Sequence, residues 1–341
     1  MKLLISAYAC EPGRGAEPGV GWNIARELAS RHELWIITRT NNRCVIEASG
    51  ESWAKDVHWV YVDPPRWLTF WKRGMRGLRI FYTLWQWAAY RRAKRLVKEV
   101  DFDLVHHVTF GKFWIPSPLA SLDIPFVFGP VGGGESAPSE LLAGFGLKTR
   151  IVEKARELIS KAVPRLPVIR NWYRGTAWTF AATSQTSDMM SAAGVKRMSV
   201  LRQSGIGHDE VERFAQMGPR VIRKGKELVL VTACRLVNWK AVDLAIEAVY
   251  IARKRGHDVK LTVLQEGPEL VELKKLRGRL KLGSVVDFKG RLPTLDDVYQ
   301  TMIEADALIH PALHEAFGQA CLEAMALGVP VITMDWACLL Y

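Results

Sequence analysis

The chain has 341 residues, and its 47 lysines and arginines exceed its 35 aspartates and glutamates, giving a formal net charge of +12. Since 49% of the residues are hydrophobic and 24% are charged, the composition excludes a disordered or fibrous protein. A chain of this length is expected to form about two domains. The basic balance favours anionic partners such as nucleotides, anionic lipid headgroups or nucleic acid.

The five cysteines are scattered along the chain, and no C-x-x-C pair occurs. Neither a zinc site nor a disulfide framework is therefore expected, which suits a reducing cytoplasm. The N-terminus is apolar only over a few residues and is typical of a first β-strand rather than of a signal peptide. No apolar run is long enough to span a bilayer, so we expect a cytoplasmic protein.

Residues 2–38 have the pattern of a strand, a loop rich in glycine and proline, a helix and a second strand. This order predicts a parallel α/β sheet. Gly19 and Gly21 could be half of a dinucleotide fingerprint, but Ile24 occupies the third glycine position and no acidic ribose ligand follows the second strand. Nicotinamide binding is therefore not expected. The loop either lets the backbone approach a ligand or is a plain β–α turn.

Residues 65–98 interleave bulky aromatic side chains with arginine and lysine. Tryptophan beside cations is typical of a membrane interface, because the indole lies at headgroup level while the cations meet anionic lipid. The segment thus predicts contact with an anionic membrane surface. Alternatively, the aromatic rings pack into a core and the basic residues form a solvated face. Nucleic acid is a poorer interpretation, since no recognisable nucleic-acid motif accompanies the segment.

A glycine-rich loop, GPVGGGE, follows a predicted strand at residues 126–128. Consecutive glycines leave backbone amides exposed and let the chain bend where side chains would clash. This loop either lines a ligand site or is flexible without ligand contact. The three glycines concerned are Gly132, Gly133 and Gly134.

Strands and helices alternate regularly between residues 228 and 333, which predicts a second parallel sheet. Ligands of such sheets bind beyond the carboxyl ends of the strands. Six candidate residues fall there, namely Arg235, Lys240, Gly267, Gly290, Glu315 and Glu323.

A short helix is predicted to start near residues 317–318 and to end at Gly328, between strands at 305–309 and 329–333. Glu315 precedes the start of this helix and Glu323 lies inside it. The first free amides of a helix carry partial positive charge and attract phosphate. The two carboxylates can each accept hydrogen bonds from a pair of hydroxyls. A diphosphate with sugar and ribose hydroxyls describes a nucleotide sugar.

The phrases HEAFG at 314–318, EAMALGVPVI at 323–332 and RLVNWKAVDLAIEAV at 235–249 resemble the E-x7-E region of retaining glycosyltransferases with the GT-B fold, family 4 or "group 1". The resemblance covers nearly the whole chain. It implies an α/β protein with two Rossmann-like parallel-sheet domains that face a cleft. The N-terminal acceptor-side domain would span 1–205, the hinge 206–225 and the nucleotide-sugar-binding domain 226–341.

The resemblance also implies roles for individual residues. Glu315 would orient the sugar hydroxyls as a catalytic residue, and Glu323 would bind the ribose diol. Arg235 and Lys240 would hold the donor phosphates, so that no metal and no cofactor besides the nucleoside-diphosphate sugar is needed. The other residues assigned to donor binding are Phe317, Gly318, Gly290, Gly267 and Gly21, while Gly132, Gly133 and Gly134 would lie on the acceptor side.

His107 is a further catalytic candidate, because the family often carries H-x-H at this strand end. In this chain the histidines are adjacent, so Val108 takes the usual second position. A catalytic role and a structural role both remain open for His106 and His107.

The family pattern continues beyond Asp335 with a Gly-Gly pair and further helices, whereas this sequence ends at Tyr341. We therefore expect an incomplete second domain without its final helices. The leading hypothesis is a retaining glycosyltransferase that moves a sugar from a nucleoside-diphosphate sugar to a glycan, a lipid-linked or a small-molecule acceptor on the inner face of the membrane. The alternative is a non-catalytic, truncated nucleotide-sugar- or carbohydrate-binding protein at the membrane surface. Nucleic acid is not expected as a partner.

Overall fold

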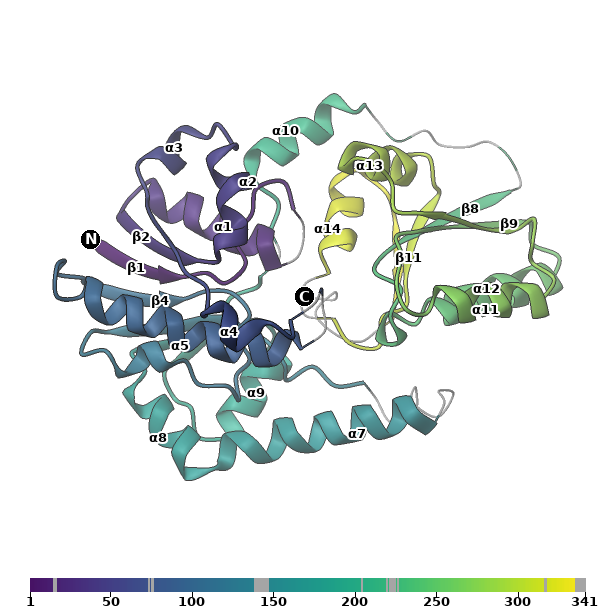
Figure 1. Ribbon diagram of the computed structural model, residues 1–341. Coiled ribbons are helices and arrows are strands. Elements are labelled where there is room, and N and C mark those ends of the chain that lie inside the picture. The colour runs from purple at the N-terminus through teal and green to yellow at the C-terminus, as the bar shows by residue number, and fades with distance from the viewer. Residues whose placement is uncertain are drawn as a thin grey trace. The chain divides into compact units, whose positions relative to one another are not determined.

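The chain divides into two compact units, each built on its own parallel sheet (Figure 1). Unit 1 comprises Met1–Gly134 and Arg156–Gln203, and unit 2 comprises Glu135–Ala155 and Ser204–Tyr341. The two parallel-sheet α/β domains predicted from the sequence are thereby confirmed. The computed structural model describes residues 1–14, 17–72, 74, 77–137, 147–203, 205–218, 220, 225, 227–315 and 318–334.

The sheet of unit 1 has seven strands in the order β3-β2-β1-β4-β5-β6-β7, and neighbouring strands are parallel. Its strands are rich in β-branched and aromatic residues. The five inner strands are largely buried, as parallel strands usually are, whereas the edge strands β3 and β7 are partly exposed. They are β1 (Lys2–Ser6), β2 (Glu33–Thr38), β3 (His58–Tyr61), β4 (Leu104–His107), β5 (Phe126–Val131), β6 (Trp178–Ala181) and β7 (Met198–Val200).

Helices cover both faces of this sheet. On one face the side chains of Leu3 and Ile5 pack with Trp22 of α1, and on the other Leu4 packs with Trp85 of α5. The helices in this part of the chain are α1 (Glu17–Ala29), α2 (Arg43–Glu47), α3 (Ser52–Lys55), α4 (Arg66–Thr69), α5 (Leu78–Leu96), α7 (Leu147–Ala162), α8 (Pro167–Gly175) and α9 (Ser184–Ala192).

The sheet of unit 2 has five strands in the order β10-β9-β8-β11-β12, again parallel. In Figure 1, α11 and α12 lie together on one side of this sheet, while α13 and α14 lie on the other. Its elements are α10 (His208–Gln216), β8 (Leu228–Ala233), α11 (Val242–Lys254), β9 (Val259–Leu264), α12 (Leu270–Arg279), β10 (Val286–Gly290), α13 (Leu295–Ile303), β11 (Ala307–His310), α14 (Gln319–Ala326) and β12 (Val331–Thr333).

Two features of the fold differ from the sequence-based expectation. The last strand of unit 1, β7, was not predicted, since only three residues of the chain pair there. The range 206–225, predicted as a hinge, contains the helix α10. The side chain of Phe214 on α10 is buried and meets the ring of Tyr299 edge-on at 4.9 Å between centroids. This helix is therefore packed into the core of unit 2.

The aromatic side chains of the segment at 65–98 are divided between the core of unit 1 and the surface. Phe81, Tyr82 and Trp85 on α5 are buried in the core of unit 1. Trp67 and Phe70, by contrast, are 73% and 81% exposed. Among the helices that the structure describes, none is long and apolar enough to cross a membrane.

Candidate functional site

The loops after β8 and β11 leave the same edge of the sheet of unit 2. The two strands are parallel neighbours, with Leu230 opposite Ala307. The main-chain amide of Leu313 donates a hydrogen bond to the carbonyl oxygen of Trp239 at 2.8 Å, which ties the two loops together. Parallel strands deliver the residues that follow them to one edge of the sheet, and Lys240 and Glu315 form an ion pair there.

Glu315 is 8% exposed, and one oxygen of its carboxylate contacts both Lys240 and His310. The ammonium of Lys240 forms an ion pair with Oε2 of Glu315. The ring nitrogen Nε2 of His310 lies 3.0 Å from the same oxygen. A buried carboxylate is costly unless it is paired and hydrogen-bonded, and these two groups meet that requirement.

His310 is neutral, because burial, and next the charge of Lys240, lower the pKa of its imidazole from 6.5 to about 3. A neutral imidazole carries a single N–H. Since Nε2 faces a carboxylate oxygen, which can only accept, we assign the proton to Nε2. The other ring nitrogen, Nδ1, is buried and has no hydrogen-bond partner within the described ranges. The hydroxyl of Thr333 on β12 donates to the carbonyl oxygen of His310 at 2.9 Å and fixes the strand end.

Glu323 lies on α14, one helical turn beyond its N-terminus. Burial raises the pKa of its carboxyl group from 4.5 to about 7. Hydrogen bonds to Oε1 from Gln319, at 3.3 Å, and from the hydroxyl of Tyr299, at 3.4 Å, act in the opposite direction, and the charge of Glu210 adds to the rise. In the described part of the chain both hydrogen bonds to this carboxylate fall on Oε1.

Close backbone approaches shape the rest of this edge. A Cβ atom on Gly267 would lie 2.1 Å from the carbonyl oxygen of Leu236, so only glycine fits there. Gly290 and Gly318 have positive φ angles of 69° and 57°, which glycine adopts without strain. Gly318 is the residue that precedes α14. Arg235 is exposed on the loop after β8, and Phe317 lies outside the described residues.

The glycine candidates of unit 1 are packed against their own unit. A Cβ atom on Gly21 would lie 2.1 Å from the carbonyl oxygen of Ala9. The amides of Gly132 and Gly134 donate to the carbonyl of Gly111 and the hydroxyl of Thr186 at 3.3 and 3.1 Å. The expectation that the glycine-rich loop leaves these amides exposed is therefore wrong. Besides Gly132 and Gly134, the third acceptor-side candidate, Gly133, has a φ of 115° and lies against the ring of Trp114.

His107 is completely buried at the end of β4 in unit 1. Its Nε2 lies 2.9 Å from the hydroxyl of Tyr82 and 3.1 Å from the carbonyl oxygen of Thr109, and its Nδ1 lies 3.2 Å from the hydroxyl of Ser117. Burial, and next the neighbouring His106, lower its pKa to about 3. Both nitrogens are engaged by protein groups, as in a structural histidine, and a catalytic role for His107 stays a prediction.

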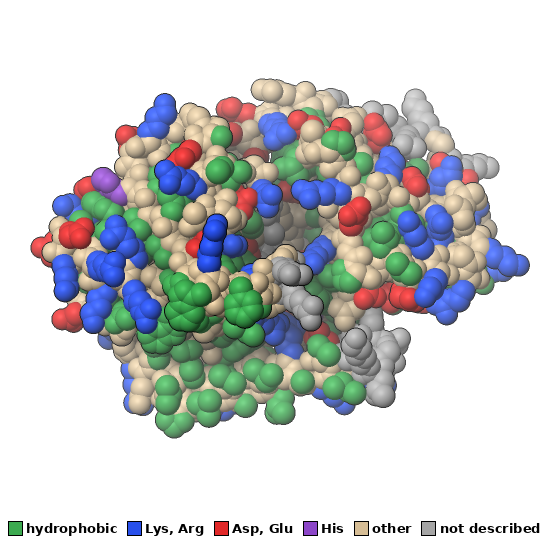
Figure 2. Space-filling model, in the orientation of Figure 1, with side chains coloured by type: hydrophobic (Ala, Val, Ile, Leu, Met, Phe, Trp, Pro, Cys, Tyr) green, Lys and Arg blue, Asp and Glu red, His purple; other side chains and the backbone are tan. Residues whose placement is uncertain are grey.

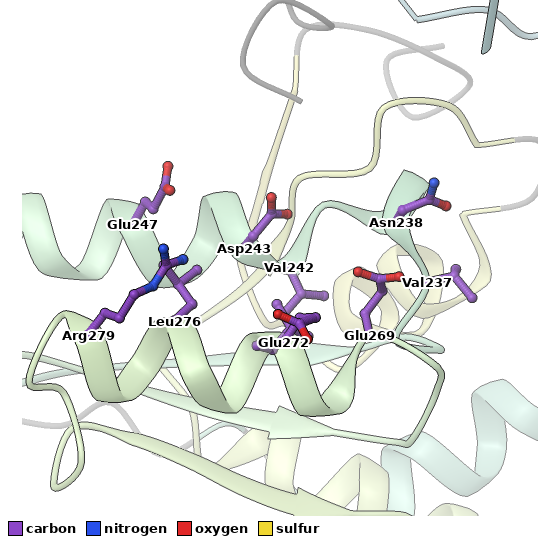
Figure 3. Close-up of a pocket in the computed structure, with 10 residues that line it drawn as sticks. Val237, Asn238, Val242, Asp243, Glu247, Glu269, Glu272, Leu276 and Arg279 are labelled. Atoms are coloured by element: carbon purple, nitrogen blue, oxygen red, sulfur yellow. The ribbon is translucent and has the colours of Figure 1, made fainter. Parts of the chain in front are cut away.

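A cavity of about 240 Å³ lies between α11 and α12, and Val237 and Asn238 of the loop after β8 also line it (Figure 3). Figure 3 shows Asp243 and Glu247 on α11 and Glu272 and Arg279 on α12, with Glu269 before α12. Burial, the largest effect, together with the charges of Glu247 and Glu269, raises the pKa of Asp243. Carboxylates around this cavity would repel a diphosphate, so it is a poor nucleotide site. Within the described ranges no three His, Cys, Asp or Glu side chains could hold a metal ion.

Three residues that the sequence did not single out contact these carboxylates: His310 contacts Glu315, while Tyr299 and Gln319 contact Glu323. His310 directly precedes Pro311 at a strand end, a position that could have drawn attention to it. The indole of Trp239 stacks on the ring of His314, with centroids 5.9 Å apart, which adds a partly exposed aromatic surface next to Lys240.

Comparison with solved structures identifies the fold as the GT-B fold of glycosyltransferases. One similar structure is the apo form of the lipopolysaccharide outer core galactosyltransferase WaaB, with a TM-score of 0.61 and 15% sequence identity. The match covers 99% of this chain and 82% of that one. At this identity the likeness concerns the fold alone.

Residues 216–340 match the family described as glycosyl transferases group 1, so unit 2 contains a domain of that family. The GtfA subunit of the UDP-N-acetylglucosamine–peptide N-acetylglucosaminyltransferase of Streptococcus parasanguinis is 31% identical over 151 residues, which are 40% of this chain and 29% of that protein. A GDP-mannose-dependent alpha-(1-6)-phosphatidylinositol dimannoside mannosyltransferase of Mycobacterium tuberculosis is 33% identical over 109 residues, 31% of this chain and 27% of that protein. The chain thus matches less than a third of the length of these two relatives.

Proposed function

We propose that this protein is a retaining glycosyltransferase that transfers a sugar from a nucleoside-diphosphate sugar. The observation that carries the proposal is the ion pair between Lys240 and Glu315 beyond the carboxyl ends of β8 and β11, with Glu323 on the next helix, α14. The family of unit 2 supports the class of reaction. The donor class proposed for this protein is inferred from the chemistry of these three side chains.

In this proposal the donor diphosphate lies near the start of α14, where helix amides and cations neutralise its charge. Arg235 and Lys240 supply that charge without a metal. Glu323 accepts hydrogen bonds from the ribose hydroxyls, and Glu315 accepts them from the sugar. The bond between the sugar carbon and the diphosphate oxygen breaks while the acceptor oxygen bonds to the same carbon. The proton of the acceptor hydroxyl passes to an oxygen of the diphosphate, and the nucleoside diphosphate leaves.

A thermal-shift panel with UDP-, GDP- and ADP-sugars tests the donor assignment. One donor should raise the melting temperature, and the rise should vanish in Glu323→Ala. A folded protein that responds to none of the donors would overturn the proposal. A donor that binds but is neither transferred nor hydrolysed would favour the alternative of a non-catalytic nucleotide-sugar-binding protein.

We also propose that unit 1 contacts an anionic membrane surface on the cytoplasmic side, where a lipid-linked acceptor would be reached. Figure 2 shows apolar side chains gathered over α4 and along α7, whose residues from Arg156 onward belong to unit 1, with lysines and arginines beside them. Besides Trp67 and Phe70, the apolar residues Leu158 and Ile159 of α7 are exposed, whereas Ser160 of this helix is buried. Exposed aromatic and apolar residues beside cations favour insertion at lipid headgroups.

Co-sedimentation with vesicles of phosphatidylglycerol and phosphatidylcholine tests this contact. The wild-type protein should pellet with anionic vesicles, and the double variant Trp67→Ser/Phe70→Ser should stay in the supernatant. Val271→Ser on α12 is a matched control, because Val271 is also exposed but belongs to unit 2. Equal pelleting of the three proteins would overturn the membrane contact.

A further inference from the structure

Among the contacts of the Glu315 carboxylate, those with Lys240 and His310 come from different elements. Lys240 approaches from the loop after β8, and His310 is the last residue of β11. We propose that His310 is a positioning residue, which holds Oε2 of Glu315 so that the carboxylate is aimed at the sugar of the donor. The proposal rests on the proposed function, because it assigns the ligand of Glu315 to the sugar.

The two contacts differ in what they can do once a donor arrives. An ammonium group has three N–H donors on a flexible stem, so Lys240 can turn part of its hydrogen bonding to a phosphate. The neutral imidazole of His310 has a single N–H, which donates its hydrogen bond to Glu315. The contact from His310 is therefore the one that persists when the diphosphate competes for Lys240.

The imidazole is itself held in place. The side chain of His310 is only 3% exposed, and its carbonyl oxygen accepts the hydroxyl of Thr333. The ring nitrogen Nδ1 is buried without a partner among the residues described, a state that costs free energy. A leucine would fill such a position without that cost, so any advantage of the imidazole lies in the contact of Nε2 with Glu315.

Loss of His310 is expected to affect the binding of the nucleotide sugar and of the nucleoside diphosphate differently. A free nucleoside diphosphate does not reach Glu315 in the proposed mode, whereas the nucleotide sugar does. Loss of His310 should therefore weaken binding of the nucleotide sugar and leave binding of the nucleoside diphosphate unchanged. A merely structural role for His310 would weaken the binding of both ligands together.

The test is calorimetric titration of the best nucleotide sugar and of its nucleoside diphosphate against the wild-type protein, His310→Leu and His310→Gln. We expect His310→Leu to weaken binding of the nucleotide sugar about tenfold, the effect of one lost hydrogen bond to a charged group, and to change binding of the diphosphate less than about twofold. His310→Gln, whose amide nitrogen can replace Nε2, should restore most of the loss. If His310→Leu does not fold, His310→Asn replaces it. The asparagine side chain is too short to reach Oε2, so this variant should show the same tenfold loss of nucleotide-sugar binding.

The matched control is Glu315→Gln, alone and combined with His310→Leu. If His310 acts through Glu315, the second substitution should add nothing to the first. Equal losses for both ligands, no loss at all, or additive losses would overturn the inference. Failure of the wild-type protein to bind either ligand would instead overturn the proposed function.

Discussion

The hydroxyl of Tyr299 donates a hydrogen bond to Oε1 of Glu323 across 3.4 Å, from the helix α13 to the helix α14. The same oxygen accepts the amide of Gln319, and the aromatic ring of Tyr299 is held by Phe214 and by the guanidinium of Arg213. Facing this carboxylate from α10 is Glu210, whose charge opposes ionisation. The carboxyl group of Glu323 therefore titrates near neutral pH, so the binding of its proposed ligand should depend on pH.

Binding of the nucleotide sugar should strengthen as the pH rises through 7. The pKa of Glu323 is about 7, and the ionised carboxylate is a stronger, acceptor-only partner for two hydroxyls, whereas the protonated carboxyl group carries an O–H donor. Affinity should therefore rise up to about tenfold between pH 6 and pH 8, as measured by calorimetry. Tyr299→Phe removes a hydrogen bond that lowers this pKa, so its midpoint should move to higher pH. A profile that is flat in both proteins would contradict the assignment of Glu323 to the ligand.

Glu323→Gln should stabilise the fold at pH 8 while abolishing nucleotide binding. A carboxyl group whose pKa is raised on folding favours the folded state below its ordinary pKa of 4.5, and that advantage is lost as the pH rises to about 7. The shift corresponds to at most about 3 kcal/mol above pH 7, and less because Glu323 is only half-buried. Denaturant titrations should show the variant to be more stable at pH 8 and equal to the wild type near pH 4.5. A variant that is less stable at pH 8 would show that interactions in the folded protein offset the cost of burying the ionised carboxylate.

Lys240→Met should destabilise unit 2 by about 3 kcal/mol, because it removes the cation from the buried carboxylate of Glu315. The double variant Lys240→Met/Glu315→Gln should recover most of that stability, since no charge is then left buried. Neither protein should bind the nucleotide. Denaturant unfolding and a binding titration measure the two effects separately, and a double variant as unstable as Lys240→Met would contradict the pairing.

Gln265→Gly should raise the free energy of unfolding. Gln265 has a φ of 77° at the end of β9, a conformation that costs a non-glycine residue about 1 kcal/mol. Its amide still donates to the carbonyl of Gly290 at 2.7 Å after the exchange. The same substitution at Gln300, within α13, serves as control and should destabilise by about 1 kcal/mol. Thermal unfolding of the two variants checks whether their effects have opposite signs.

Gly267→Ala should lower stability by several kcal/mol, because its methyl group would overlap the carbonyl oxygen of Leu236. The loop after β8 would have to move, so binding through Lys240 should fall as well. Gly278→Ala in α12 is the matched control, since nothing lies within 4 Å of its added Cβ and alanine favours a helix. A tolerated Gly267→Ala would mean that the two loops are not in close contact.

Periodicity predicted both sheets because parallel strands are short apolar runs and their order along the chain implies where their ends meet. That both Lys240 and Glu315 follow strand ends could be predicted from this order, whereas their pairing depends on β8 and β11 being neighbours in the sheet. His310 and Tyr299 could not be found in this way, since their roles depend on burial and on which atoms face a carboxylate. The glycine-rich loop was misjudged for a related reason, because the partner of the Gly134 amide, Thr186, is 52 residues away in sequence.

The hydrogen bond between Leu313 and Trp239 sets a condition for engineering this protein. This main-chain hydrogen bond joins the two backbone segments that carry Lys240 and Glu315. A graft that replaced residues 235–240 with a loop from another protein would lose register with residues 311–315 unless both were exchanged together. Altered donor preference is therefore best sought by swapping the two segments as one cassette, and libraries that vary either segment alone should yield mainly misassembled proteins.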